Sequence, residues 1–449
     1  MPLDPLPTVW NVYNLQGSPF WQDTLEGASD SRHPASLFVG RSQELERLRA
    51  RILGGESSRQ AVAGVPGVGK TTLVQVLKAR LIADAYLTTD RVVPFILKDT
   101  VEGLFGRVLG ALYDTLLTNR PQCGGNPAMQ AAQLLVRADR LPTGGGGFSA
   151  AGFGATATRG VTVVTPKDLM IDGPRIMRDL LAMVRGSDAR GVVLHLNNLE
   201  SLSTRDARHA ADLLQSLRDP MLMHPGLHYV LVGTADAMLT VLGTHKQVHS
   251  VFTSPLVLEP LSLDELHALL DARYQDRRAD PARAARSPVA PGAVDALYAL
   301  YRGDLRGLLK ALDDGVEPCI GMRPVPDVDA EISAALAGGV DSPRAVLPVA
   351  PVEITELQPY LQRRYGRELD GAADATRREW LQLWADAGPN ATYTQKELTA
   401  TWGTTQATVS RTLTAFQANG YVVALPDTAP TQYALAGTAR LVFGVPPLG

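Results

Sequence analysis

The chain has 449 residues, enough for about three domains at roughly 150 residues each. Hydrophobic residues make up 45% and charged residues 20%, a composition that excludes disorder along the whole length. The 43 Lys and Arg residues against 46 Asp and Glu leave a net charge of −3, so the chain as a whole is not attracted to nucleic acid or to an anionic membrane. Cys123 and Cys319 lack metal-ligand spacing, which favours unpaired thiols in a reducing compartment.

No targeting or membrane-spanning segment is recognisable in the sequence. The N-terminus lacks a basic stretch followed by an apolar one, which argues against a secretory signal. No segment approaches the ~18 consecutive apolar residues that would span a bilayer. We therefore expect a cytoplasmic protein that has no membrane partner.

Short apolar strands alternate with helical segments between residues 37 and 259. This alternation predicts an α/β domain in which helices cover both faces of a parallel sheet. Ser42 is expected to cap the first helix, because its hydroxyl can accept from the amide of Leu45. The expected strands are residues 60–63, 92–96, 192–196 and 228–232.

The remaining regions differ in composition from this domain. A Gly-rich insertion within this domain predicts a flexible stretch that leads into a projecting hairpin, which is a candidate contact to DNA or to a neighbouring subunit. A disordered segment is an equal alternative. Ser262 and Glu265 have capping-box spacing at the start of a helical lid. The predicted regions are an irregular leader over 1–36 that packs on the surface of the next domain, the α/β domain over 37–259 with the insertion at 141–165, the lid over 260–318, a Pro-rich linker over 319–352 and a C-terminal unit over 353–449.

The segment from Gly64 to Thr71 matches the phosphate-binding pattern G-x-x-x-x-G-K-[ST] at every fixed position, between an expected strand and an expected helix. Glycines let backbone amides converge on phosphate oxygens, and the helix N-terminus adds its positive dipole end. Lys70 supplies a charge to the phosphates of ATP or ADP, and Thr71 supplies a hydroxyl ligand to Mg²⁺. The expected nucleotide-binding residues here are Gly64, Pro66, Gly67, Val68, Gly69, Lys70, Thr71 and Thr72.

A P-loop ATPase also needs an acidic residue at the end of a neighbouring strand. The candidate strand ends at Asn197 and Asn198, and the first carboxylate after them is Glu200. Asparagine can accept a hydrogen bond from magnesium-bound water but cannot act as a general base. Either Glu200 takes over part of the task, or hydrolysis is slow and the domain works as a nucleotide-dependent switch; a solvated loop carboxylate is an equal alternative for Glu200.

In their order along the chain, these motifs resemble AAA+ ATPases, in the branch shared by origin-recognition initiators and STAND signalling ATPases. The resemblance covers roughly residues 37–318 and includes Phe38-Val39-Gly40-Arg41 and Gly303-Asp304-Leu305-Arg306. It implies that Val39, Gly40 and Arg41 lie against the adenine, that the residue at Thr234 senses the γ-phosphate and that Arg306 reaches from the lid to the nucleotide. The catalytic candidates are Lys70, Asn197, Asn198, Glu200, Thr234 and Arg306.

One element of the AAA+ pattern is missing. Rings of this family place an arginine finger after the sensor strand, and residues 219–272 contain no arginine. Arg205 and Arg218 are the candidate substitutes. Because an arginine finger contributes about 10³–10⁵ in rate, hydrolysis activated by a neighbouring subunit is in doubt.

The C-terminal unit predicts a winged helix-turn-helix. Helices are expected at 377–387, 394–402 and 404–419, followed by a two-stranded wing at 420–425 and 432–435. The pattern resembles winged-helix domains of MarR-like regulators and of initiator ATPases, whose second helix enters the major groove of double-stranded DNA. The expected DNA-binding residues are Thr405, Gln406, Thr408, Ser410 and Arg411, and Thr412 is also expected to face solvent.

The charge of this unit limits how tightly one copy binds DNA. Residues 353–449 contain eight Lys or Arg and nine Asp or Glu, whereas tight non-specific binding needs several phosphate contacts. The sequence therefore predicts a slow ATPase that couples its nucleotide to assembly of a homo-oligomer and to DNA binding. Two alternatives stay open: a non-hydrolysing, nucleotide-switched transcription regulator, and a signalling or defence scaffold whose winged helix binds a partner protein.

Overall fold

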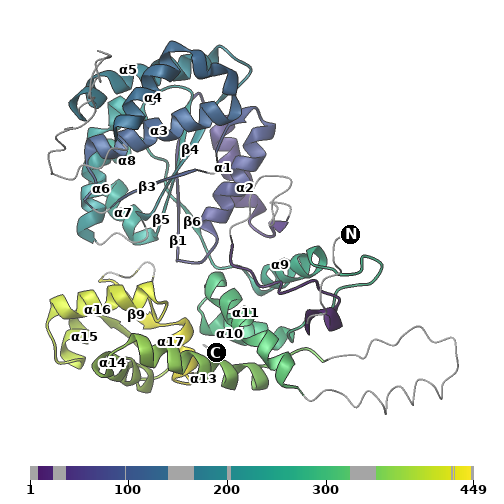
Figure 1. Ribbon diagram of the computed structural model, residues 1–449. Helices are drawn as coiled ribbons and strands as arrows, with labels where there is room; N and C mark the ends of the chain where they lie inside the picture. The colour runs from purple at the N-terminus through teal and green to yellow at the C-terminus, as the bar shows by residue number, and fades with distance from the viewer. Residues whose placement is uncertain are drawn as a thin grey trace, which may run out of the picture.

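A computed structural model describes residues 9–23, 37–89, 91–96, 98–139, 166–199, 204–323, 350–425, 428 and 430–445. The predicted insertion at 141–165, Glu200 and most of the predicted linker lie outside these residues. Figure 1 shows the α/β domain at the top, with the helical lid and the C-terminal unit beneath it.

A six-stranded parallel sheet forms the centre of the α/β domain. Its strands pair in the order β2-β4-β5-β1-β6, and β3 also pairs with β4. The four predicted strands are present as β1, β3, β4 and β5, whereas β2 and β6 have only two and three residues and so carry no readable period. The strands are β1 (Arg59–Gly64), β2 (Tyr86–Leu87), β3 (Val92–Pro94), β4 (Gly191–Asn197), β5 (Leu227–Gly233) and β6 (Leu256–Leu258).

Helices cover both faces of this sheet, as the alternating pattern predicts (Figure 1). One apolar cluster joins α1 and α2 to one face, and a larger cluster joins α3 to α8 to the other. None of the described helices combines the length and apolar character that crossing a membrane requires. The helices are α1 (Ser42–Leu53), α2 (Lys70–Ala83), α3 (Val101–Asn119), α4 (Pro127–Asp139), α5 (Pro166–Arg185), α6 (Thr204–Ser216), α7 (Ala235–Gly243) and α8 (Lys246–His249).

The predicted cap of α1 is wrong. Ser42 is the first residue of the helix, and Arg41 is the N-cap residue, with no side chain accepting a hydrogen bond there. Arg41 has a left-handed backbone with φ of 55°, which turns the chain sharply into the helix. The N-cap residue therefore lies one position before Ser42, although serine is a favoured N-cap residue.

The lid is a three-helix unit that begins with the predicted capping box. Ser262 Oγ accepts from the Glu265 amide at 3.2 Å, and Glu265 Oε2 accepts from the Ser262 amide at 2.9 Å. This reciprocal pairing satisfies two amides that would otherwise lack partners at the helix start. The helices are α9 (Leu263–Asp276), α10 (Pro291–Leu300) and α11 (Leu305–Met322).

Part of the predicted irregular leader belongs to the lid core. Residues 9–13 form a 3₁₀ helix, and the side chains of Trp10, Tyr13 and Phe20 are buried against the lid helices. Trp21 lies between two arginines of the lid, with the guanidinium carbons of Arg273 and Arg277 4.4 and 4.8 Å from its ring centroid. The prediction of an irregular surface leader is therefore wrong for residues 9–23, because scattered aromatics give no periodic signal of burial.

The C-terminal unit is a winged helix-turn-helix. The two helices of the motif and the two wing strands lie where the sequence pattern predicts them, and β7, which was not expected, completes a three-stranded antiparallel sheet in the order β7-β9-β8. The predicted fold class is therefore confirmed. The elements are α13 (Ile354–Ala372), α14 (Ala375–Asp386), β7 (Thr392–Thr394), α15 (Gln395–Thr401), α16 (Gln406–Ala418), β8 (Val422–Ala424), β9 (Gln432–Leu435) and α17 (Gly437–Val442).

The winged helix and the lid share one apolar core. Leu357 and Leu361 of α13 and Leu441 of α17 belong to the same cluster as the buried leucines of α11. Gly315 of α11 allows this close approach, since a Cβ there would lie 3.0 Å from Leu361 Cδ2 and still closer to Leu357 Cδ1. The winged helix is consequently packed on the lid as well as being tethered to it.

Two buried histidines of the sheet are expected to lower the free energy of unfolding below neutral pH. Burial lowers the pKa of His195 to about 3 and that of His228 to about 4, against about 6.5 for an unfolded histidine. The fold accommodates the neutral imidazoles, so the stabilisation is complete above pH 6.5 and is lost as the pH falls toward the folded-state values. As the pH falls from 6 to 5, we expect the free energy of unfolding to fall by up to about 1.4 kcal/mol for each of these histidines.

Urea unfolding of the wild type and of His195→Leu at pH 7, 6, 5 and 4 measures this slope. The variant should have the smaller dependence on pH, while His249→Leu, at an exposed position, should match the wild type. An equal slope in all three proteins would refute the assignment.

Candidate nucleotide and DNA sites

The predicted nucleotide-binding segments meet at the carboxyl edge of the sheet. β1 leads into the P-loop, β5 into Thr234 and β4 into Asn198, and the three strands are adjacent and parallel. Ala63 pairs with Gly233 and Leu196 with Leu231, so the three strand ends lie close to one level. In open α/β sheets, ligands bind in the crevice at this edge.

The P-loop has the backbone geometry of an anion site. Gly67 and Gly69 have left-handed φ values of 78° and 94°, which glycine adopts readily and other residues do not. Lys70 is 3% exposed, and its Nζ donates to the carbonyl oxygens of Gly64 at 3.1 Å and Val65 at 2.8 Å. The ammonium group is thus held inside the loop, at the N-terminus of α2, where the helix dipole favours a negative ligand.

The segment before α1 braces the P-loop. The Arg41 guanidinium is buried and donates to the carbonyl of Val68, 3.3 Å away, and to that of Glu259. Burial lowers the pKa of Arg41. Val39 packs against the lid core, and Gly40 lies against Glu265, whose Oε1 would be 3.1 Å from a Cβ at that position. The predicted base-contacting residues therefore lie between the sheet domain and the lid, with the Arg41 side chain engaged by protein carbonyls.

The predicted sensor and magnesium positions carry neutral side chains. Asn197 is half-buried and its carbonyl accepts from the Phe95 amide at 2.9 Å; Asn198 is exposed and left-handed. The Thr234 hydroxyl caps α7, accepting from the Ala237 amide at 3.4 Å. Within the described ranges, no group of three or more His, Cys, Asp or Glu could hold a metal ion. Thr71, the predicted Mg²⁺ ligand, is half-buried in the first turn of α2.

The lid reaches the P-loop at Gly67. A Cβ on Gly67 would collide with Oδ1 of Asp304 and would lie 3.4 Å from Cβ of Arg306. The predicted lid arginine is therefore beside the phosphate-binding loop, with an exposed side chain. Asp304 was not predicted at the site. Its carboxylate also caps α11, accepting from the Gly307 amide at 3.1 Å. Burial raises the pKa of this carboxyl.

The predicted DNA-binding residues lie at the start of α16. The side chains of Thr405, Gln406, Ser410 and Arg411 are exposed, and that of Thr408 is half-buried. Thr405 is the N-cap residue and its hydroxyl accepts from the Thr408 amide at 3.3 Å.

The prediction that Thr412 faces solvent is wrong, because it is only 2% exposed. It lies three residues after Val409 and four before Phe416, on the same buried face of the helix.

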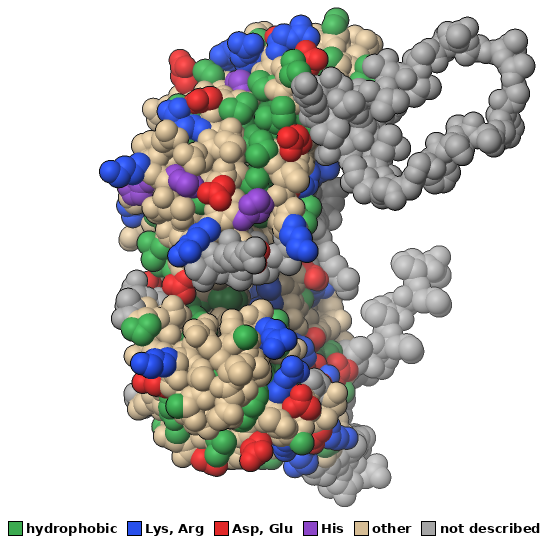
Figure 2. Space-filling model, turned by 90° about the vertical axis from the view of Figure 1, so that its left-hand side faces the viewer, with side chains coloured by type: hydrophobic (Ala, Val, Ile, Leu, Met, Phe, Trp, Pro, Cys, Tyr) green, Lys and Arg blue, Asp and Glu red, His purple; other side chains and the backbone are tan. Residues whose placement is uncertain are grey.

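Four of the eight basic side chains of the C-terminal unit are either buried or paired with acidic side chains. Arg440 is fully buried, and the side chains of Arg364, Arg377 and Arg378 form ion pairs with acidic neighbours. On the face seen in Figure 2, basic and acidic side chains are intermingled and no continuous basic surface is visible. These ion pairs leave few basic side chains of the unit available for contacts with phosphates.

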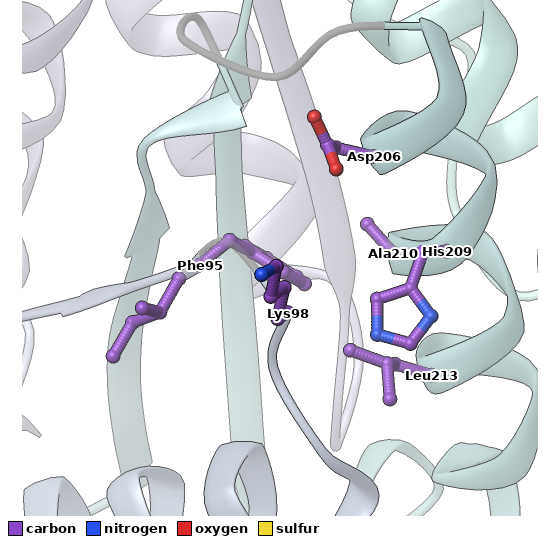
Figure 3. A pocket seen from close by; sticks show the side chains of 7 residues that line it. Phe95, Lys98, Asp206, His209, Ala210 and Leu213 are labelled. Carbon is purple, nitrogen blue, oxygen red and sulfur yellow. The ribbon is translucent and has the colours of Figure 1, made fainter.

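A small depression beside the end of β3 lies outside this set of residues. Figure 3 shows Phe95 and Lys98 from the segment after β3, opposite Asp206 and His209 of α6. His209 Nε2 is 2.6 Å from the carbonyl oxygen of Asp99, which ties the two segments together. The volume of about 10 Å³ matches a single water and excludes a nucleotide.

Comparison with known proteins gives structural similarity only. No protein-family model matches the chain, and no curated protein matches it. The ORC2 protein of Aeropyrum pernix, in ADPNP–ADP complexes, is 15% identical, with 94% of this chain and 95% of that chain covered and a TM-score of 0.43. The ORC1 protein of Aeropyrum pernix in complex with DNA is 14% identical, with 91% and 92% covered and a TM-score of 0.39. Drosophila ORC bound to DNA is 14% identical, with 98% and 93% covered and a TM-score of 0.40.

The similarity extends over nearly the whole chain. Its identities and TM-scores are low, so a function for this protein has to rest on its own residues.

The contact between the lid and Gly67 predicts a difference between two glycine substitutions. Gly67→Ala and Gly69→Ala both place a Cβ on a left-handed residue, at a cost of about 1 kcal/mol. Only Gly67→Ala also collides with Asp304, because no atom of the described residues lies within 4 Å of a Cβ at Gly69. We expect Gly67→Ala to lower the free energy of unfolding by a further 1–3 kcal/mol, about the cost of overpacking.

Urea denaturation of both variants without nucleotide measures this difference. Adding Asp304→Ala to Gly67→Ala should recover most of the additional loss, as a double-mutant cycle reports for residues in contact. Equal losses for the two alanine variants would contradict the contact.

Proposed function

We propose that the protein binds ATP or ADP at the P-loop and couples the bound nucleotide to DNA binding by its winged helix. The observation that carries the nucleotide site is Lys70, buried inside a loop with two left-handed glycines at the carboxyl edge of a parallel sheet. The lid residue Arg306 lies beside the same loop. Backbone amides, a lysine and a lid arginine together suit a chain of phosphates.

Within this proposal, hydrolysis is slow. Mg²⁺ bound with the nucleotide neutralises phosphate charge, and Thr71 is the residue of this chain that would hold it. Lys70 and Arg306 stabilise the phosphate charge, and the Thr234 hydroxyl is directed toward the γ-phosphate. Asn197 and Asn198 cannot remove a proton from an attacking water, which leaves Glu200 as the carboxylate nearest in sequence for that role.

DNA binding in this proposal depends on assembly. The exposed cations Lys396 and Arg411 lie on the helix-turn-helix, and Arg363 and Arg367 lie on α13. So few phosphate contacts give one copy a low affinity, and a nucleotide-dependent homo-oligomer that presents several winged helices raises it through avidity. The asparagine pair favours a second candidate, in which the nucleotide is a ligand of a DNA-binding regulator and is not hydrolysed.

Nucleotide binding is tested by replacing the lysine of the P-loop. Lys70→Ala should weaken binding of a fluorescent ATP analogue at least about tenfold, since the loss of a hydrogen-bonded charge pair typically costs 1.5–3 kcal/mol. Lys246→Ala, at an exposed position on α8, should bind like the wild type.

Phosphate release separates the enzyme from the switch. Turnover of the wild type above that of Lys70→Ala, lost in Glu200→Gln, supports slow hydrolysis. The absence of turnover supports the nucleotide-switched regulator, and the absence of nucleotide binding by the wild type would rule out both.

DNA binding is tested by the salt dependence of affinity for the full chain. Arg411→Ala should weaken binding to double-stranded DNA and reduce the slope of log Kd against log salt by about 1, as expected for one lost phosphate contact. Lys246→Ala, an equal change of charge on α8 of the sheet domain, should leave the slope closer to that of the wild type. No binding at low salt, with ATP present, would remove DNA from the proposal and favour a protein partner for the winged helix.

A further inference from the structure

One short turn of the lid touches both the P-loop and the winged helix. The turn, residues 301–304, connects α10 to α11, and residues 305–307 begin α11. At one end, the Asp304 carboxylate lies against Gly67 of the P-loop, with Cβ of Arg306 next to it. The Gly307 amide donates to the Asp304 carboxylate, so a force on this side chain acts directly on the backbone of the turn.

The other end of the turn holds the winged helix. Arg302 donates from Nε to the Leu435 carbonyl at 2.8 Å and from a terminal nitrogen to the Pro389 carbonyl at 3.4 Å. The ring of Tyr301 lies against Gly437, where a Cβ would be 2.9 Å from it. These contacts secure the junction between β9 and α17, where the Ala436 amide donates to the Tyr421 carbonyl at 3.0 Å.

The backbone of the turn is strained between these two ends. Arg302 has a left-handed φ of 51° and Gly303 one of 79°. A left-handed backbone is unfavourable for arginine and persists only where surrounding contacts hold it. A small displacement of Asp304 is therefore expected to move Arg302 as well, because relaxation of the turn releases this backbone strain.

The charge at Asp304 has a clear effect on a phosphate ligand. Its carboxylate lies on a loop that is otherwise built for anions, near the positive charges of Lys70 and Arg306. A nearby carboxylate opposes every added negative charge, and the opposition grows from a diphosphate to a triphosphate. A neutral side chain of the same shape would remove this effect and keep the helix cap, because asparagine caps as well as aspartate.

We propose that Asp304 determines how strongly this site distinguishes a triphosphate from a diphosphate, and that Arg302 transmits the resulting movement of the turn to the winged helix. The proposal builds on the proposed function, since it requires a nucleotide at the P-loop. A bound triphosphate repels Asp304, the turn shifts, and the grip of Tyr301 and Arg302 on the β9–α17 junction loosens. The winged helix thereby responds to the number of phosphates.

The first experiment measures nucleotide discrimination. Affinities for ADP and for a non-hydrolysable ATP analogue are determined for wild type, Asp304→Asn and Asp271→Asn, the last an exposed carboxylate of α9. Asp304→Asn should bind the ATP analogue at least about fivefold more tightly, the lower range of typical coupling between sites, and change ADP affinity much less. Asp271→Asn should match the wild type. An unchanged ratio of the two affinities in Asp304→Asn would overturn the proposal, because a purely structural role of the cap does not alter that ratio.

The second experiment follows the winged helix by amide hydrogen exchange of the full chain. In the wild type, the ATP analogue should speed exchange in a peptide covering residues 432–442 more than ADP does. Arg302→Ala should exchange fast there without nucleotide and show no further response, while Arg278→Ala, whose guanidinium bonds only to nearby carbonyls of the lid, should respond like the wild type. Arg302→Lys, which keeps the charge but lacks the planar guanidinium that makes the two hydrogen bonds, gives an independent reading if the alanine variant does not fold.

Different outcomes distinguish failure of this inference from failure of the proposed function. Failure of the wild type to bind either nucleotide would overturn this inference together with the proposed function. Nucleotide binding without a change of exchange in 432–442, or with an equal change in Asp304→Asn, would overturn the inference and leave the nucleotide site intact.

Discussion

The missing side chain of Gly67 is the constraint on which the arrangement of the two halves depends. Because this residue has no Cβ, the lid can place Asp304 directly against the phosphate-binding loop. The lid in turn shares its apolar core with α13 and α17 of the winged helix. This close approach, together with the contacts of Arg41 and Gly40, helps to position the lid and the winged helix packed on it, including the helix α16 that the sequence pattern assigns to DNA.

Elements that are defined by residues close together in the sequence could be predicted from the sequence. β1, β4 and β5 are six or seven residues long and each contains a short apolar stretch. The P-loop is a contiguous motif, so the sheet and its predicted nucleotide-binding edge were readable. The capping box at Ser262 depends on residues three apart and was also predicted.

Features made by distant residues were not readable in the same way. The burial of Trp10 and Phe20, the short strand β6 and the contact of Asp304 with Gly67 each depend on segments far apart in the chain. Thr412 shows a second source of error, because a polar residue carries no sign of burial unless the helix face is counted with care. Glu200 and the Gly-rich insertion remain predictions from the sequence.

The composition of the lid core also constrains the order in which the protein folds. This core takes Trp10 and Phe20 from near the start of the chain, leucines of α11 from its middle and Leu441 from near its end. Bringing such distant residues together is slow, and synthesis delivers the N-terminal portion first. The sheet domain can therefore form on the ribosome while Trp10 and Phe20 are still exposed, and during this interval a chaperone or a neighbouring chain has access to apolar side chains that the finished protein conceals.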